Sequence, residues 1–233
     1  KILARFSHKV LEGFPRSFPA KISTQVIGNP VREGFYHVAP PAQRIRDSDP
    51  RLKILVIGGS SGARALNDLL PQILQQWPNA VTPQIWHQAG KKNIADAEQA
   101  YAAAGFNVNI NDQNSPVKLV DFIHDMPAAY SWADVIICRS GALTVAEIAA
   151  VGVASILIPY PYAVDDHQTK NAHYLADAGA AVIIQERDLQ AGQVIALLQD
   201  LQVNPAKIQA MAQAAYSMAK PEALDLVVQN LAL

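Results

Sequence analysis

The stretch KILVIGGSSGARALN, residues 53–67, joins a short apolar run to a glycine-rich turn and then to a segment with helical spacing. A nearly continuous apolar run of this length is typical of a strand that is buried on both faces. Glycines between such a strand and a helix form the turn that approaches ligands in nucleotide-binding folds. The stretch therefore predicts the first strand–turn–helix unit of an α/β domain.

The same alternation continues along the rest of the chain. It predicts strands at 53–57, 83–87, 116–120, 134–138, 154–158 and 181–184, helices between them at 63–76, 92–104, 125–132, 142–151, 167–178 and 190–200, and two final helices at 205–219 and 221–231. Strand–helix alternation implies a parallel sheet with right-handed crossovers. The predicted fold class is α/β, a doubly wound, Rossmann-like domain that binds ligands at the carboxyl ends of its strands.

The first 50 residues have a different character. Residues 1–13 are predicted to form a helix, 23–27 a short strand, and 39–50 a polar linker that contains prolines. One helix and one strand cannot bury themselves, so we expect them to be the tail of a preceding domain. The start at Lys1 in place of Met favours a processed or excised piece.

Composition restricts the possible functions. Half of the 233 residues are apolar and 17% are charged, a balance typical of a globular protein with a core. Nineteen Lys and Arg against 20 Asp and Glu argue against nucleic-acid binding. The single cysteine, Cys138, excludes an intramolecular disulfide and indicates a reducing compartment. No carboxylate cluster predicts a metal site, and we expect no cofactor.

Two loops have the same design. Residues 58–63 and 139–142 each place a small glycine-containing turn between the end of a strand and the start of a helix. Backbone N–H groups at a helix start lack intrahelical partners and favour an anion. The pair of loops therefore predicts a phosphate site, with two ordinary turns capped by Ser60 and Ser140 as the alternative.

Three polar residues in the second half are candidates for sugar recognition. Glu147, on the helix after the second loop, can accept hydrogen bonds from the hydroxyls of a ribose, or it can be a solvated carboxylate. Gln168 and Asn171 share a helix face and can bind sugar hydroxyls. The alternative for this segment is a helix start that is capped by Asp165 or Asp166.

Other functional classes fit less well. Residues 58–62 spell the G-x-S-x-G of a hydrolase, for which Asp134 and His167 or His173 would complete a triad, but no oxyanion segment precedes them. The G-x-G-x-x-G and P-loop patterns are absent. His87 lies at a predicted strand end, from which it could reach the ligand site.

Five blocks together resemble the MurG family, bacterial glycosyltransferases that transfer N-acetylglucosamine (GlcNAc) from UDP-GlcNAc to lipid I and so make lipid II. The blocks are IGNPVRE (27–33), GGSSGARALN (58–67), WHQAGK (86–91), FIHDMPAAYSWADVIICRSGALTVAEIAA (122–150) and DDHQTKNA (165–172). The resemblance implies the C-terminal, donor-binding half of a GT-B glycosyltransferase. It assigns 1–30 to a remnant of the acceptor domain, 31–50 to an interdomain segment and linker, 51–219 to the UDP-GlcNAc-binding domain, and 220–233 to a helix that packs toward the missing domain.

The resemblance also implies roles for individual residues. Ser60, with the loop from Gly59 to Gly62, would hold the diphosphate, and Ala142, Leu143 and Thr144 would line the phosphate and the sugar. Arg32 and Ile123 would contact the uracil, and Glu147 would bind the ribose. Gln168 and Asn171 would bind GlcNAc, with His167 adjacent. Ser61, His124 and His167 depart from residues that are common in the family.

The family's reaction inverts the anomeric centre, and the acceptor is the C4 hydroxyl of the muramyl sugar. The resemblance implies that the base lies in the missing domain and that this chain contains no catalytic residue. We therefore expect it to bind UDP-GlcNAc or UDP without turnover. The full-length protein would be peripheral, and it would contact lipid I at the cytoplasmic face of the bacterial inner membrane. The alternatives are a nucleotide-sugar-binding subunit of a two-chain enzyme, or a transferase for another lipid acceptor.

Overall fold

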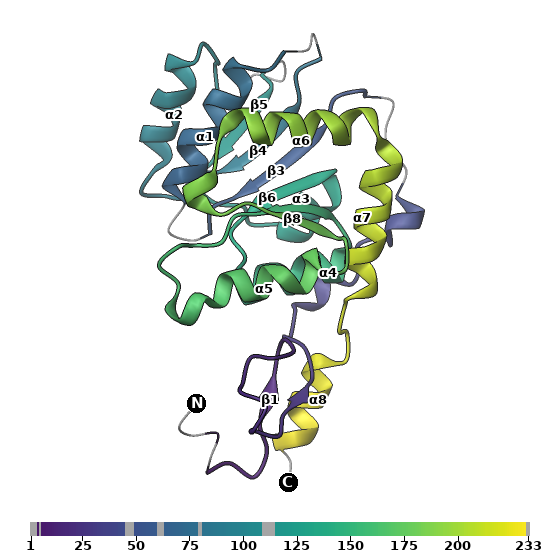
Figure 1. Ribbon diagram of the computed structural model, residues 1–233. Helices are drawn as coiled ribbons and strands as arrows, with labels where there is room; N and C mark the ends of the chain where they lie inside the picture. Colours follow the sequence, from purple (N-terminus) through teal and green to yellow (C-terminus); the bar gives the residue numbers. More distant parts are fainter. Residues whose placement is uncertain are drawn as a thin grey trace.

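The computed structural model describes residues 4, 6–44, 49–59, 63–78, 81–108 and 115–231 (Figure 1). Its main sheet has six parallel strands: β3 (Lys53–Ile57), β4 (Gln84–Gln88), β5 (Val117–Val120), β6 (Val135–Cys138), β7 (Ala154–Leu157) and β8 (Ala181–Ile183). The helices are α1 (Arg64–Gln75), α2 (Ile94–Ala103), α3 (Met126–Trp132), α4 (Ala142–Val151), α5 (His167–Ala176), α6 (Ala191–Val203), α7 (Pro205–Ser217) and α8 (Ala223–Leu231). The elements predicted from residue 51 onward are confirmed, with ends that differ by a few residues.

The strand order is β5-β4-β3-β6-β7-β8. The chain therefore builds outward from β3 in one direction, returns to the centre, and builds in the other direction from β6. This reversal between β3 and β6 is the switch point of a doubly wound sheet, where ligands bind in such folds. The predicted fold class is confirmed.

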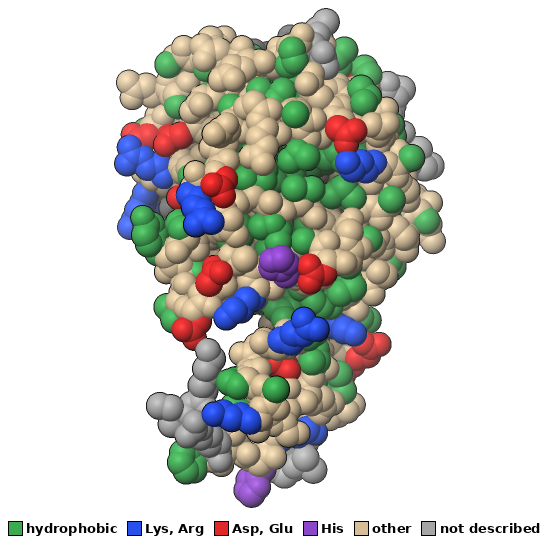
Figure 2. Space-filling model, in the orientation of Figure 1, with side chains coloured by type: hydrophobic (Ala, Val, Ile, Leu, Met, Phe, Trp, Pro, Cys, Tyr) green, Lys and Arg blue, Asp and Glu red, His purple; other side chains and the backbone are tan. Residues whose placement is uncertain are grey.

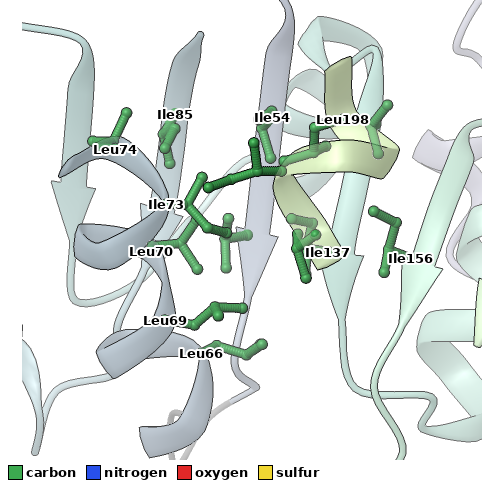
Figure 3. Packing of buried hydrophobic residues seen from close by; sticks show 14 of the residues in the cluster. Ile54, Leu66, Leu69, Leu70, Ile73, Leu74, Ile85, Ile137, Ile156 and Leu198 are labelled. Atoms are coloured by element: carbon green, nitrogen blue, oxygen red, sulfur yellow. The ribbon is translucent and has the colours of Figure 1, made fainter. Parts of the chain in front are cut away.

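Both faces of the sheet are covered, because alternate residues of the central strands enter two separate cores. Ile54 and Val56 pack with α1, α2 and α6, whereas Leu55 and Ile57 pack with α3, α4 and α5. Figure 3 shows the first core, in which the leucines of α1 lie over Ile54, Ile85 and Ile137. Burial on both faces explains why β3 is apolar at nearly every position.

Charged side chains are distributed without a dominant sign. On the face shown in Figure 2, blue and red side chains are interspersed among the described residues, in keeping with the net charge of −1. A nucleic-acid-binding face would gather basic side chains. Within the described ranges, no helix has the length and apolar character that crossing a bilayer requires.

The N-terminal segment differs from its prediction. Instead of continuing a helix, residues Leu11–Glu12 form strand β1, which pairs in parallel with β2 (Gln25–Val26). The buried Glu12 carboxylate accepts hydrogen bonds from the Ser17 backbone N–H and from the Thr24 hydroxyl, and these bonds hold the chain in an open loop. The helix predicted for 1–13 is therefore wrong where the residues are described, and the strand at 23–27 is present in shortened form.

Segments that flank the main sheet are short. The predicted interdomain segment and linker contain two 3-10 turns, η2 (Glu33–Phe35) and η3 (Pro41–Gln43). Residues 45–48 lie outside the described part of the chain. Helix α8 lies beside β1 in Figure 1. A Cβ at Gly28 would lie 2.4 Å from the Lys220 Cβ, so the chain at Gly28 closely approaches the start of α8. The domain boundaries given above stay predictions.

Two glycines that follow helices provide a matched test of packing. Gly152 caps α4 at φ 71°, and a Cβ there would lie 2.7 Å from Pro41 Cγ and from Tyr216 Cβ. Gly179 follows α5 at φ 75°, with nothing within 4 Å of a Cβ. Gly152→Ala should lower the free energy of unfolding by ~1–2 kcal/mol through left-handed backbone strain and by a further ~1–3 kcal/mol through overpacking. Gly179→Ala should lower it only by the strain contribution. Urea unfolding measures both, and equal losses would contradict the packing at Gly152.

Candidate functional site

The site is defined by the edge of the sheet at which the parallel strands end. The loops after β3 and β6 begin at Gly58 and Arg139, and these strands are neighbours. The loop after β7 leads through η4 (Val164–Asp166) into α5, and the loop after β5 leads into α3. Most of the predicted site residues therefore lie in loops or first helical turns at one edge.

The first loop is described only in part. Gly59 is exposed at φ 81°, a conformation that glycine adopts without strain, and nothing lies within 4 Å of a Cβ there. Ser60, Ser61 and Gly62 lie outside the described residues. The diphosphate role of Ser60 and Gly62 stays a prediction.

The second loop is held by α5. The Ser140 side chain is fully buried, and its hydroxyl donates to the backbone carbonyl of Gln168 at 2.8 Å. The Asn171 amide donates to the carbonyl of Ser140 at 3.1 Å. Gly141, not Ser140, is the N-cap of α4, and no side chain caps this helix. The capping alternative for Ser140 is therefore wrong.

The open start of α4 suits an anion. The backbone N–H groups of Ala142, Leu143 and Thr144 belong to the first turn, where no intrahelical carbonyl is available. No side chain supplies the missing acceptor, and the helix dipole adds positive character at this end. These three residues are intermediate or exposed, with the Leu143 side chain 59% exposed. This turn provides donors for a phosphate or a carboxylate.

The first two turns of α5 contain the predicted sugar-binding residues. The Gln168 side-chain oxygen accepts from the Tyr160 backbone N–H at 2.9 Å, and Asn171 is buried against Ser140. Each amide therefore has one polar group engaged within the protein. The exposed His167 donates from Nδ1 to the carbonyl of Val164 at 2.7 Å, since a carbonyl only accepts.

The turn before α5 has an unusual backbone. Asp165 and Asp166 are both left-handed, at φ 54° and 51°. The Asp166 side chain makes no capping bond, although this residue occupies the N-cap position. The Lys170 ammonium donates to the carbonyl of Asp165 at 2.9 Å and holds the turn. The alternative in which an aspartate caps this helix is therefore wrong for Asp166.

Glu147 lies on α4 beside residues from two other elements. The Tyr130 hydroxyl of α3 donates to its Oε2 at 3.1 Å, and the Arg32 guanidinium lies 4.0 Å from its Oε1. Burial raises the pKa of Glu147, and the Tyr130 hydrogen bond and the Arg32 charge oppose that rise. The Glu147 side chain is 17% exposed. The alternative of a freely solvated carboxylate is therefore wrong.

Two further residues belong to the surroundings of the site. Ile123, in the loop after β5, is buried in the same core cluster as Phe35 and Tyr130. Arg139 donates to the carbonyls of Ile158 and Pro159 and pairs with Glu186, so it joins the loops after β6 and β7. The sequence analysis missed this brace and the Tyr130 contact. The only signal for the Arg139 contacts in the sequence was a lone arginine in a loop of small residues.

His87 does not reach the site. It is fully buried between Tyr101 Oη, 3.0 Å from Nδ1, and Asn67 Oδ1, 3.1 Å from Nε2. Since the Asn67 amide nitrogen donates to the carbonyl of Ala89, its oxygen accepts, and His87 is neutral with its proton on Nε2. Burial lowers the pKa of His87 to about 3. The hypothesis that His87 contacts a ligand is wrong; it joins β4 to α1 and α2.

The hydrolase triad is not assembled. Asp134 precedes β6, at the amino edge of the sheet, where its Oδ2 accepts from the Lys53 backbone N–H at 2.9 Å. His167 begins α5, beyond the carboxyl edge. Within the described residues, no group of three or more His, Cys, Asp or Glu side chains is arranged to hold a metal ion.

Comparisons with known proteins agree on one kind of relative. Residues 53–227 match the family described as "Glycosyltransferase family 28 C-terminal domain". The chain is 43% identical over 226 residues to a protein of Marinobacter nauticus and 46% identical over 229 residues to one of Burkholderia multivorans. Both are named UDP-N-acetylglucosamine–N-acetylmuramyl-(pentapeptide) pyrophosphoryl-undecaprenol N-acetylglucosamine transferase. The alignments cover 97% and 98% of this chain and 60% of each relative.

A solved structure extends the likeness to three dimensions. The crystal structure of Acinetobacter baumannii MurG superposes with a TM-score of 0.80 at 38% identity. The superposition covers 98% of this chain and 61% of the Acinetobacter baumannii chain. The chain thus spans about three fifths of the proteins that it matches, and its fold is that of a C-terminal GT-B domain.

The buried His87 predicts acid sensitivity of the fold. Its pKa falls from an ordinary 6.5 to about 3 on folding, so between these values the unfolded chain binds a proton that the folded chain excludes. Stability is then lost as the pH falls, by about 2 kcal/mol between pH 7 and 5. Urea unfolding at both pH values should show this loss in the native chain and in His37→Gln, but a smaller one in His87→Gln. Equal losses in all three proteins would contradict the assignment.

Proposed function

Because this chain belongs to the glycosyltransferase family 28 C-terminal domain family, we propose that it is the donor-binding part of a glycosyltransferase and binds a UDP-sugar at the carboxyl edge of its sheet. Its resemblance to the MurG family is confirmed. The observation that carries the proposal is the start of α4, where backbone N–H groups open to a ligand lie one turn from the oriented carboxylate of Glu147. A nucleoside diphosphate requires this pairing of anion and diol recognition.

The proposed donor is UDP-GlcNAc and the proposed acceptor is the C4 hydroxyl of lipid I, which gives lipid II. Support comes from the names of relatives that are 43% and 46% identical. In this proposal Gly59, Ser60 and Gly62 face the diphosphate with the first turn of α4. Uracil lies at Ile123 and Arg32, the ribose at Glu147, and GlcNAc at Gln168 and Asn171 beside His167.

The chemistry proposed for this domain is stabilisation of the leaving group. Inversion at C1 of the sugar expels UDP, and negative charge grows on the diphosphate. Fixed N–H groups and a helix dipole already stand where this charge develops, so they stabilise it without reorganisation. One such donor is worth ~3 kcal/mol of activation free energy at comparable sites. The base that deprotonates the acceptor is assigned to the part of the relatives that this chain does not span.

The same part of the full-length protein is proposed to contact lipid I. Peripheral binding at the cytoplasmic face of the bacterial inner membrane belongs to that proposal, since the acceptor is a membrane lipid. The boundaries 1–30, 31–50, 51–219 and 220–233 complete it as acceptor-domain remnant, linker, donor domain and C-terminal helix. A donor-binding subunit of a two-chain enzyme and a transferase for another lipid acceptor are the alternatives.

The Glu147 role predicts selective loss of nucleotide binding. Hydrogen bonds to a charged group contribute about 1.5–3 kcal/mol, so Glu147→Gln should weaken UDP binding by about ten- to hundredfold. Titration calorimetry with UDP measures this change. Glu98→Gln, at an exposed carboxylate on α2, is the matched control and should bind as the native chain does. Equal affinities of the two variants would remove Glu147 from the site.

Assignment of donor binding to this chain and of the base to another domain predicts binding without turnover. The 233-residue chain should bind UDP-GlcNAc but form no lipid II from UDP-GlcNAc and lipid I, because the proposed base is elsewhere. Addition of the acceptor domain in trans should restore transfer, as followed with radiolabelled GlcNAc. Efficient transfer by the chain alone would refute this assignment, and restoration with a different polyprenyl acceptor would favour the corresponding alternative.

A further inference from the structure

Glu147 and three other residues form a closed cycle of contacts. The Tyr130 hydroxyl donates to Glu147 Oε2 at 3.1 Å, and the ring of Tyr130 meets that of Phe35 edge-on at 5.2 Å. The Arg32 guanidinium lies 5.3 Å from the centre of the Phe35 ring and 4.0 Å from Glu147 Oε1. The cycle therefore joins η2 and the residue before it to α3 and α4.

The two sides of this cycle differ in exposure. Phe35 and Tyr130 are both fully buried, whereas the Arg32 side chain is 67% exposed and Glu147 is 17% exposed. Buried aromatic side chains occupy one rotamer within a packed core. The phenol is thus a fixed donor, and it reaches a carboxylate that borders the surface.

We propose that Tyr130 is a positioning residue, whose hydroxyl holds Oε2 of Glu147 so that Oε1 faces Arg32 and the ribose of a bound nucleotide. This inference rests on the proposed function, because it requires Glu147 to bind the ribose. A carboxylate with one oxygen fixed has lost most of its rotational freedom before the ligand arrives. The ligand then loses less free energy in ordering it.

The ionisation states suit this arrangement. Burial, followed by the nearby Glu147 charge, raises the pKa of Tyr130 well above its ordinary value, so the phenol remains a donor at neutral pH. The titratable and charged groups that bear on Glu147 are Tyr130 from α3, Arg32 from the interdomain segment, and the buried Cys138 of β6. Tyr130 and Arg32 both lower the pKa of Glu147 against the effect of burial. Loss of the phenol hydroxyl should therefore raise that pKa.

The test uses Tyr130→Phe in the full 233-residue chain with two nucleotides, UDP and 2′-deoxy-UDP. Titration calorimetry gives the ratio of their dissociation constants, which reports the contact with the ribose hydroxyl. We expect the variant to reduce the preference for UDP at least threefold. We also expect the pH at which UDP affinity is half lost on acidification to move upward. Simple destabilisation of the fold leaves the ratio unchanged, because both nucleotides bind the same folded chain.

Tyr101→Phe is the matched control, since Tyr101 is equally buried and its hydroxyl contacts His87 instead of Glu147. It should leave the ratio of the UDP and 2′-deoxy-UDP dissociation constants unchanged. A Glu147→Gln background completes a double-mutant cycle, in which Tyr130→Phe should have no further effect on the UDP preference.

The outcomes separate this inference from the function on which it rests. If the native chain prefers UDP and loses that preference in Glu147→Gln, but Tyr130→Phe keeps both the preference and the acid midpoint, the positioning role is overturned and the proposed function stands. If the native chain does not bind UDP, the proposed function falls and the inference with it.

Discussion

The candidate site depends on the burial of β3 and β6 on both faces. Each strand places alternate side chains into two separate cores, so a shift of one residue would exchange every side chain between them. Register and direction are therefore fixed strongly. The loops after these neighbouring strands must then emerge side by side, and the start of α4 stands open where they do.

A second, polar constraint joins the parts of the site. Ser140 is buried and satisfies both its hydroxyl and its carbonyl through α5. Leaving a buried polar group without a partner costs ~1–3 kcal/mol, so α5 and the loop after β6 hold their relative position. Arg139 adds the loop after β7 to the same unit. The residues proposed for the diphosphate and for the sugar thus share one rigid support.

The sequence predicted the periodic part of this structure and missed contacts between distant residues. Apolar runs and helical spacing located the elements after residue 51, because burial determines both patterns. The helix expected at 1–13 failed because Glu12 binds partners beyond its own turn. Nothing in the sequence distinguishes a buried His87 from an exposed one at the same strand end. The Tyr130–Glu147 bond joins two helices 17 residues apart, and no local pattern encodes such a pair.

The left-handed turn at Asp165 and Asp166 has a consequence for how relatives of this chain can diverge. Its backbone is held by side chains of Lys170 and His167, which lie on the exposed side of α5 and take no part in either core. Substitutions in residues 160–166 can therefore reshape the rim beside Gln168 without disturbing the sheet. Selection for a different ligand can act on this turn while the fold beneath it is inherited unchanged.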